Sequence, residues 1–338
     1  MKLAGTAKIQ IPSKVKSLVD LIIFYFCGEY RLKEFFEMSV NDIYLPHERK
    51  AADIQYRQSL ATILAYGEKV LSTPQGVPAI TYIGLSPMVF KMKNGVPLVT
   101  ERAIPFWKSA IGEICGFING VTKEEVLERE FSCSWWKPWV TEEKAREIGF
   151  EPGDLGPASY GGAFHSFPYP PEPFNQISHA INQLKKYPYV RTVHITPWIP
   201  YWIGRGGFQR AAVSPCHGWM FFRVINARLW MQMHQRSADF PVGVPANMIQ
   251  YAALLLMFGH VTGYTPDTFV HSFFDTHIYE DQIPRMQEMI RRTPRRLPSL
   301  FLTKEGLAIT DIFDFRPRHF ELRDYNPHPA IKDIPVAV

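Results

Sequence analysis

The sequence has few cysteines, and none of them is closely paired. Its 338 residues contain four, Cys27, Cys115, Cys133 and Cys216, with no C-x-x-C motif. Structural zinc sites and disulfide frameworks usually need clustered cysteines. The sequence therefore predicts no metal site and no disulfides, and it favours a reducing compartment, which we expect to be the cytoplasm.

Charge of one sign and long apolar runs are also scarce. The 37 basic and 32 acidic residues leave a net charge of +5, which is too small to indicate a nucleic-acid partner. The apolar run at 18–27 is interrupted by Asp20 and is too short to span a bilayer. No later segment is expected to cross a membrane either. Hydrophobic residues make up 46% of the chain, which predicts a globular protein with a substantial core.

Hydrophobic periodicity predicts both helices and strands. Helices are expected at 53–71, 106–118, 123–130, 174–186 and 248–263. Strands are expected within 79–91 and at 191–196, 271–279 and 300–303. The glycine-rich run at 153–162 lacks the strand–GxGxxG–helix context of a dinucleotide site, so it is read as turns.

One stretch, 214–247, collects chemically active side chains. Cys216 stands in a turn-like Pro-Cys-His setting, and two strand-like runs, the cluster at 236–239 and Asn247 follow it. A thiol, a cation, a hydroxyl, a carboxylate and an amide in one unit indicate a site for a small anionic substrate. A cysteine-protease interpretation of Cys216 and His217 is poor, because adjacent residues seldom place an imidazole on the neighbouring thiol.

The helix expected at 106–118 carries a single acid, Glu113. Burying an ionised carboxylate is costly unless it is paired or hydrogen-bonded. Two interpretations stay open: a glutamate on a helix face that reaches water, or a proton-handling residue that lines a pocket.

Several motifs, in one order from about Gly84 to the last residue, resemble the thymidylate synthase family. They are PLVTER (97–102), WxxW (136–139), DLGPxxYG (154–161), NQLKKYP…R (182–191), PCH (215–217), QRSAD (235–239), GVPAN (243–247), FVH…DTHIY (269–279) and YNPHP…PVAV (325–338). The resemblance implies an α+β, three-layer fold over residues 46–338, with a twisted mixed β-sheet flanked by helices and dimerisation through the sheets. Residues 1–45 are read as an N-terminal extension.

The resemblance also implies an activity. A member of the family would methylate dUMP at C5 to dTMP, as a homodimer that uses 5,10-methylenetetrahydrofolate as cosubstrate and needs no metal. C5 of uracil is a poor nucleophile until a thiolate adds to C6, and Cys216 matches that thiolate.

Further catalytic residues are implied around the base. Glu113 matches a buried glutamate that handles protons at C5, and Tyr160 and His217 match members of the same proton network. His217 can equally be a structural histidine. Asn247 matches the amide that reads the O4/N3 edge of uracil.

The nucleotide's phosphate and sugar have their own matches. Arg236 matches an arginine that touches both the phosphate and the cysteine region, and Ser237 matches a hydroxyl on the phosphate side. Arg191 matches one of two arginines that a partner subunit donates to the phosphate. His277 and Tyr279 match the pair that holds the sugar 3′-hydroxyl.

The folate has a third set of matches. Asp239 matches the carboxylate that faces the pterin ring, and Gly243 follows it at the start of GVPAN. Trp136 and Val338 match groups that stack on the folate and close over it. Arg102 stands in place of a basic residue that meets the folate tail.

The chain departs from the family pattern in the phosphate ligands. The second arginine of the pair is Thr192, and an arginine expected around 74–82 is missing. We expect Arg205 or Arg210 to replace them.

Two more departures lie near Asn247. Phe221 replaces a glutamine, and Ala246 replaces a large aromatic residue. The smaller side chain enlarges the pocket, so a pyrimidine nucleotide 5-hydroxymethylase acting on CMP, dCMP or dUMP is the alternative. Asn247, the tryptophans and the terminal PVAV favour methylation. A further alternative is an inactive relative that binds RNA through the arginines within 291–296.

Overall fold

A mixed sheet organises the part of the chain that the computed structural model describes, residues 39–71, 73, 75–204 and 209–337. Its seven strands pair in the order β1-β2-β7-β6-β5-β4, and β3 also pairs with β7. Only β6 and β7 run parallel among the described pairs; the others are antiparallel. The strands are β1 (Glu68–Val70), β2 (Ala79–Ile83), β3 (Met88–Lys91), β4 (His194–Ile195), β5 (Trp219–Ile225), β6 (Arg228–Asp239) and β7 (Thr265–Tyr279).

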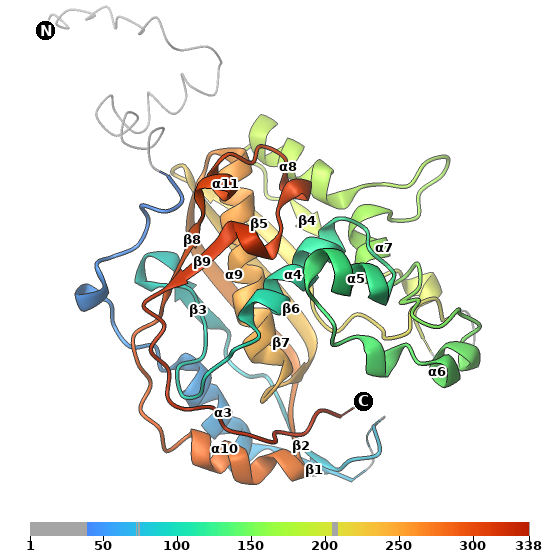
Figure 1. Ribbon diagram of the computed structural model, residues 1–338, viewed down its shortest axis with the longest axis vertical. Coiled ribbons are helices and arrows are strands. Elements are labelled where there is room, and N and C mark those ends of the chain that lie inside the picture. Colours follow the sequence, from blue (N-terminus) through green and yellow to red (C-terminus); the bar gives the residue numbers. More distant parts are fainter. Residues whose placement is uncertain (1–38, 72, 74, 205–208, 338) are drawn as a thin grey trace, which may run out of the picture. The chain divides into compact units, whose positions relative to one another are not determined.

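Helices pack on the sheet, as the α+β expectation requires (Figure 1). They are α3 (Gln55–Tyr66), α4 (Trp107–Ile118), α5 (Glu124–Phe131), α6 (Glu142–Glu147), α7 (Tyr160–His165), α8 (Gln176–Lys186), α9 (Gly243–Thr262), α10 (Ile283–Met289) and α11 (Lys304–Leu307). A small second sheet pairs β8 (Ser299–Leu302) with β9 (Phe320–Arg323). The predicted twisted mixed sheet with flanking helices is confirmed.

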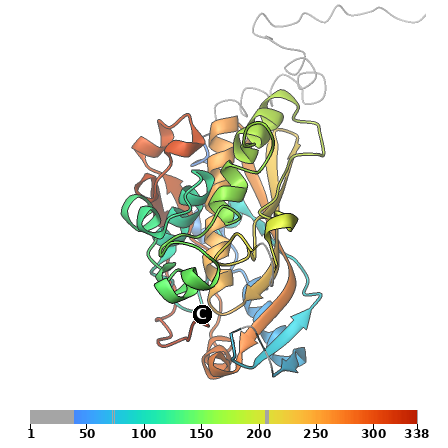
Figure 2. The ribbon, with the colours of Figure 1, turned by 90° about the vertical axis from the view of Figure 1, so that its right-hand side faces the viewer.

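The layers follow from α9, which contacts β6 and β7 on one side and α4 on the other. Seen edge-on, the sheet, α9 and the green helices α4 and α5 follow one another (Figure 2). All fifteen residues of α9 from Val244 to Gly259, apart from Ala246, are buried, because the helix is apolar around its circumference and has core on every side.

The expectation that no later segment could cross a membrane is wrong on composition. α9 is long and apolar enough to do so, and it is the one such helix among the described residues. Of its most apolar 18-residue window, 89% is buried inside the protein, so the length and hydropathy of α9 are explained by its place between the sheet and α4.

The predicted N-terminal extension has two parts. Residues 1–38 lie outside the described residues. Val40 and Ile43 are buried in the core, and Asn41 exchanges two hydrogen bonds with the backbone of Leu302 at 2.8 and 2.9 Å. Residues 39–45 therefore pack with the catalytic body, and 39–338 forms one compact unit.

Candidate active site

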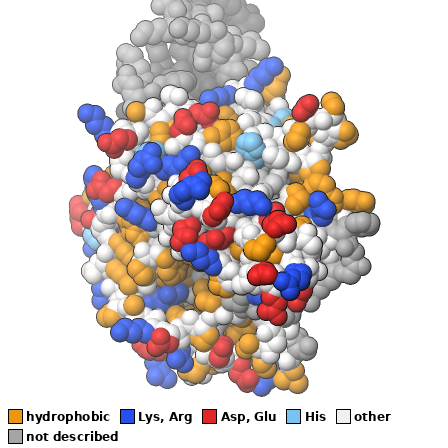
Figure 3. Space-filling view, turned by 45° about the vertical axis from the view of Figure 1, so that its right-hand side comes forward, with side chains coloured by type: hydrophobic (Ala, Val, Ile, Leu, Met, Phe, Trp, Pro, Cys, Tyr) orange, Lys and Arg blue, Asp and Glu red, His pale blue; other side chains and the backbone are white. Residues whose placement is uncertain are grey.

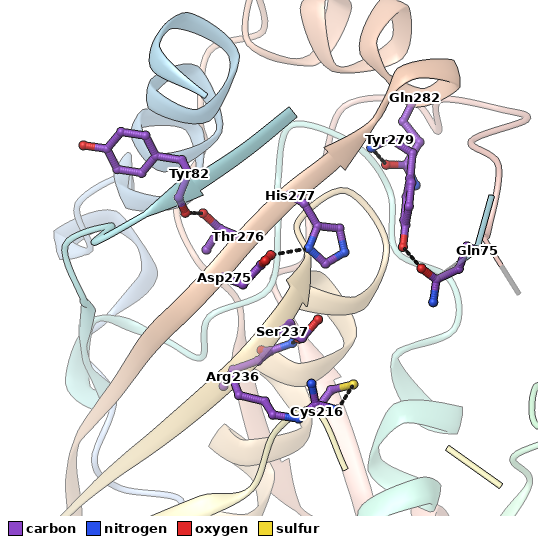
Figure 4. A network of polar contacts seen from close by, with 11 residues as sticks. Gln75, Tyr82, Cys216, Arg236, Ser237, Asp275, Thr276, His277, Tyr279 and Gln282 are labelled. Atoms are coloured by element: carbon purple, nitrogen blue, oxygen red, sulfur yellow. Dashed lines mark hydrogen bonds and ion pairs between the residues drawn. The ribbon is translucent and has the colours of Figure 1, made fainter. Parts of the chain in front are cut away.

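A cleft of about 1150 Å³ opens where β6 and β7 end. Cys216, Arg236 and Ser237 line it together with His277 and Tyr279, and Figure 4 shows these side chains gathered around one space. These residues belong to three separate sequence motifs, and the parallel pairing of β6 with β7 brings the motifs at 235–239 and 269–279 together. The volume of the cleft is larger than that of a usual single-ligand pocket, so the cleft has room for two ligands.

The backbone N–H and the backbone carbonyl of Cys216 are both hydrogen-bonded. Its N–H donates to the Tyr160 hydroxyl at 2.7 Å, and its carbonyl accepts from the N–H groups of Arg236 and Ser237 at 2.8 and 3.4 Å. The Arg236 guanidinium lies 3.6 Å from Sγ. Burial raises the pKa of the Cys216 thiol, Arg236 lowers it and Asp275 raises it. The expected cation is present, but it only partly offsets the effect of burial.

Arg236 also fixes the loop that carries the cysteine. Its Nε donates to the Pro215 carbonyl at 2.8 Å and its Nη2 to the Ser214 carbonyl at 2.9 Å. The guanidinium lies over the ring of Trp198, 5.3 Å from its centroid, in a cation–π contact. Trp198 lines the cleft and was not singled out from the sequence, where it was one of many aromatics in an irregular stretch.

His217 is a buried imidazole that is held by two aromatic neighbours. Its Nδ1 shares a hydrogen bond with the Tyr251 hydroxyl at 2.7 Å, and its ring stacks on Tyr160 at 4.4 Å. Burial and the nearby Arg236 lower the pKa of His217 to about 3. The imidazole is therefore neutral at neutral pH and acts as a hydrogen-bonding group.

Glu113 is buried and fully engaged, which fits the expectation for a costly carboxylate. Its Oε1 accepts from the indole nitrogens of Trp135 and Trp136, both at 2.7 Å, and its Oε2 accepts from Gln250 at 2.8 Å. Burial raises the pKa of Glu113, and the three donors oppose that rise. Asn247, also buried, donates to Gln250 at 3.0 Å.

Two further polar groups of the cleft come from the end of β7. His277 Nδ1 pairs with Asp275 at 2.7 Å, and the Tyr279 hydroxyl donates to Gln75 at 3.1 Å. Ser237 pairs with Asp275 across the β6–β7 register. Ser237, His277 and Tyr279, which the sequence predicts to bind phosphate and sugar, therefore lie near one another (Figure 4).

The remaining phosphate candidates lie elsewhere or outside the described residues. Arg191 is exposed in the segment before β4 and is not among the residues that line the cleft. Arg210 is exposed as well, and Arg205 lies outside the described residues. Among the described residues, neither Arg191 nor Arg210 is thus placed in the cleft as a replacement for the missing arginines.

Asp239 lies at the other end of this stretch, two residues beyond Ser237 on β6. Gln282 donates to both of its oxygens at 3.3 Å, and to the Pro335 carbonyl of the C-terminal segment at 3.0 Å. Burial raises the pKa of Asp239 to about 6, against the opposing effects of His277, the Val242 N–H, Gln282 and Arg102. A carboxylate here can accept the ring N–H donors of a pterin, which fits a folate.

The other described residues predicted to bind the folate are not among those that line the cleft. Gly243 is the first residue of α9. Trp136 is buried against Phe117 and Tyr160 and is not among the residues that line the cleft, whereas its neighbour Trp139 lines it, as Trp198 does.

Arg102 is buried and donates to the Pro241 carbonyl at 2.8 Å, and Val338 lies outside the described residues. Among the described residues, no group of three or more His, Cys, Asp or Glu side chains could hold a metal ion.

Comparison with known protein families gives a match over most of the chain. The family model described as thymidylate synthase covers residues 54–338. The matched range includes every helix and strand from α3 onward, and it contains the whole cleft.

Proposed function

The chain belongs to the thymidylate synthase family, and from that premise we propose that it reductively methylates dUMP to dTMP. Family membership makes the protein an enzyme of the pyrimidine C5 methyltransferase type, a one-carbon transferase of nucleotide biosynthesis that takes nucleotide and folate substrates. Its choice of dUMP, the methyl product and a cytoplasmic location are the parts that we propose.

One observation supports the chemistry most: the Cys216 sulfur lies 3.6 Å from the Arg236 guanidinium at the cleft wall. When a nucleotide brings its phosphate to Arg236, C6 of the base reaches the thiol. Addition of the thiolate forms the C6–S bond and moves an electron pair toward C5 and O4, which makes C5 nucleophilic. Asn247 binds the base edge, and Glu113 exchanges the proton at the C5 side.

The cosubstrate, 5,10-methylenetetrahydrofolate, would supply the methylene carbon and then the hydride that reduces it to methyl. Asp239 is proposed to accept from the pterin, and Gln282 connects this carboxylate to the C-terminal segment. We propose that this segment covers the folate and excludes water, which a methylating enzyme needs because water would otherwise trap the exocyclic carbon as hydroxymethyl.

A hydroxymethylase is the second candidate, and Ala246 favours it. The side chain next to Asn247 is only a methyl group and is partly buried at the start of α9. A site enlarged at this position has room for water or for a ribose.

Nucleic-acid binding through the arginines within 291–296 has less support. Three of these arginines donate to backbone carbonyls: Arg292 to Glu101 and Pro329, Arg295 to Asn326 and Pro327, and Arg296 to Lys50. On the face shown in Figure 3, basic and acidic side chains are interspersed. These arginines serve to hold chain segments together.

A homodimer is also proposed, with the sheet face opposite α9 as the contact. A row of side chains crosses that face in register: His194, Phe221, Gln232, Val270 and Val89. Phe221 is 47% exposed and Val89 44% exposed, and an apolar face of this kind is typical of an interface. A second copy, related by a two-fold axis, would cover it and could bring its Arg191 to the cleft.

A substrate panel tests the proposed reaction. The protein is incubated with methylenetetrahydrofolate and, separately, dUMP, UMP, dCMP or CMP, and the product is identified by mass. We expect a methylated product from dUMP with the wild type and none with Cys216→Ser. Hydroxymethylation of CMP without a product from dUMP would show that the second candidate is right.

A further inference from the structure

Asn247 is the middle member of a buried chain of five side chains, which we call the carboxamide chain. Gln250 donates to Glu113 at 2.8 Å, Asn247 donates to Gln250 at 3.0 Å, and Gln235 donates to Asn247 at 3.1 Å. His271 Nε2 pairs with the Gln235 oxygen at 2.8 Å. All five side chains are buried, so water does not compete for these hydrogen bonds.

The Glu113 end fixes the direction of Gln250. Two indole N–H groups already donate to Oε1 of this side chain, and its Oε2, which contacts Gln250, can only accept when Glu113 is ionised. The amino group of Gln250 must therefore face Glu113, and its oxygen must face Asn247. Asn247 must therefore donate from its amino group to the Gln250 oxygen.

The other end fixes Gln235 independently. Its amino group donates to the Ser237 carbonyl at 3.1 Å as well as to Asn247, and a carbonyl can only accept. The Gln235 oxygen therefore faces His271, whose Nε2 must carry the proton. Two separate anchors thus require the same orientation of Asn247: nitrogen toward Gln250, oxygen toward Gln235.

The contacts to Gln250 and Gln235 use one N–H and one oxygen lone pair of Asn247, and one of each remains. A primary amide has one N–H and one oxygen lone pair side by side on the edge between its two outer contacts. The donor of this edge lies on the side of Gln250 and Glu113, and the acceptor lies on the side of Gln235. Uracil presents an acceptor at position 4 and a donor at N3, whereas cytosine presents a donor and then an acceptor.

We propose that Gln250 is a positioning residue that, with Gln235, fixes the order of donor and acceptor on Asn247 and so selects 4-oxo over 4-amino pyrimidine nucleotides. The inference rests on the proposed function, in which Glu113 serves the C5 side of the base and position 4 faces the donor. A cytosine would meet donor with donor and acceptor with acceptor. Turning Asn247 over to suit it would oppose like groups at both Gln250 and Gln235.

The chain offers a matched control in Gln176. This glutamine is also buried, and its side chain makes hydrogen bonds to the backbone of Ala163 and Thr196, outside the carboxamide chain. Gln250→Leu and Gln250→Met remove the contacts to Glu113 and Asn247 with two different apolar shapes, and Gln176→Leu makes the same chemical change elsewhere.

The test measures dissociation constants of dUMP and dCMP by calorimetry for each protein, so it does not depend on turnover. A site with paired polar groups discriminates strongly, and we expect the wild type to prefer dUMP by about 100-fold or more. Both Gln250 variants should narrow the ratio of the two dissociation constants at least about tenfold, mainly by losing dUMP affinity, because the Asn247 amino group then loses its partner and only Gln235 still opposes turning of the amide. Gln176→Leu should keep the wild-type ratio.

Two results would count against the inference, and they are distinguishable. A wild type that prefers dUMP, with the same ratio in the folded Gln250 variants, would overturn the role of Gln250 and leave the proposed function standing. A wild type that prefers dCMP would overturn the proposed base and the proposed order of donor and acceptor alike.

Discussion

At the scale of residues, the side chains that carry reactive or charged groups could be predicted from the sequence, whereas the side chains that position them could not. Cys216, Arg236 and Glu113 were identified from residue type and motif, since a lone thiol, a cation and an acid in an apolar helix each suggest a role. The roles of Gln250 and Gln235 were not identified, because no sequence pattern separates a glutamine in a buried hydrogen-bond chain from a glutamine exposed to solvent. Their roles follow only from which atoms they contact.

Asp239 gives a prediction at this scale. Its pKa is raised to about 6 in the folded protein, so the folded state binds more protons than the unfolded state between about pH 4 and pH 6. The free energy of unfolding should therefore fall as pH rises through this window, by up to about 3 kcal/mol. Denaturant unfolding of wild type and Asp239→Asn between pH 4 and pH 7 measures it.

The variant supplies the control, because an asparagine does not titrate. The difference in stability between the two proteins should shift in favour of Asp239→Asn as pH rises, and then level off above about pH 7. A difference that stays constant across the window would mean that the pKa of Asp239 is not raised.

At the scale of elements, helices and strands were predictable where periodicity was strong, and their ends were not. The helix expected at 53–71 stops at Tyr66, because Gly67 adopts an extended conformation and β1 begins at once. The helix expected from 248 begins at Gly243, since a proline is tolerated in a first turn. The strand expected at 271–279 extends back to Thr265.

The packing of α4 on α5 gives a second prediction. A Cβ added at Gly112 would lie 1.8 Å from the Phe131 carbonyl oxygen, whereas one at Gly116 would lie 2.4 Å from the end of the Leu127 side chain. Backbone cannot move aside as a leucine methyl can. Gly112→Ala should therefore lower the free energy of unfolding by about 2 kcal/mol more than Gly116→Ala does.

Both variants gain the same helix propensity, so their difference in denaturant unfolding isolates the contact. Equal stabilities, or a more stable Gly112→Ala, would show that α4 and the end of α5 can separate without loss.

At the scale of the whole molecule, the order of motifs predicted the α+β fold and the family. No sequence feature predicted that β6 and β7 run parallel, and this pairing is what brings Ser237 beside Asp275 and Asp239 beside His277. The register of distant strands depends on packing across the whole sheet, which local patterns do not encode.

The exposed sheet face gives a third prediction. Phe221→Asp places a charge in the middle of the proposed contact, so sedimentation velocity should show a shift from dimer to monomer. Tyr169→Asp is the control, because Tyr169 is exposed on a loop before α8 and not on the sheet. An unchanged dimer in Phe221→Asp would place the contact elsewhere.

The proposed reductive methylation is tested most directly by the stoichiometry of one reaction. With dUMP and methylenetetrahydrofolate, the amounts of dihydrofolate and nucleotide product are measured together. We expect one dihydrofolate for each dTMP, because the hydride that makes the methyl group comes from the folate. A nucleotide product formed without dihydrofolate would contradict it.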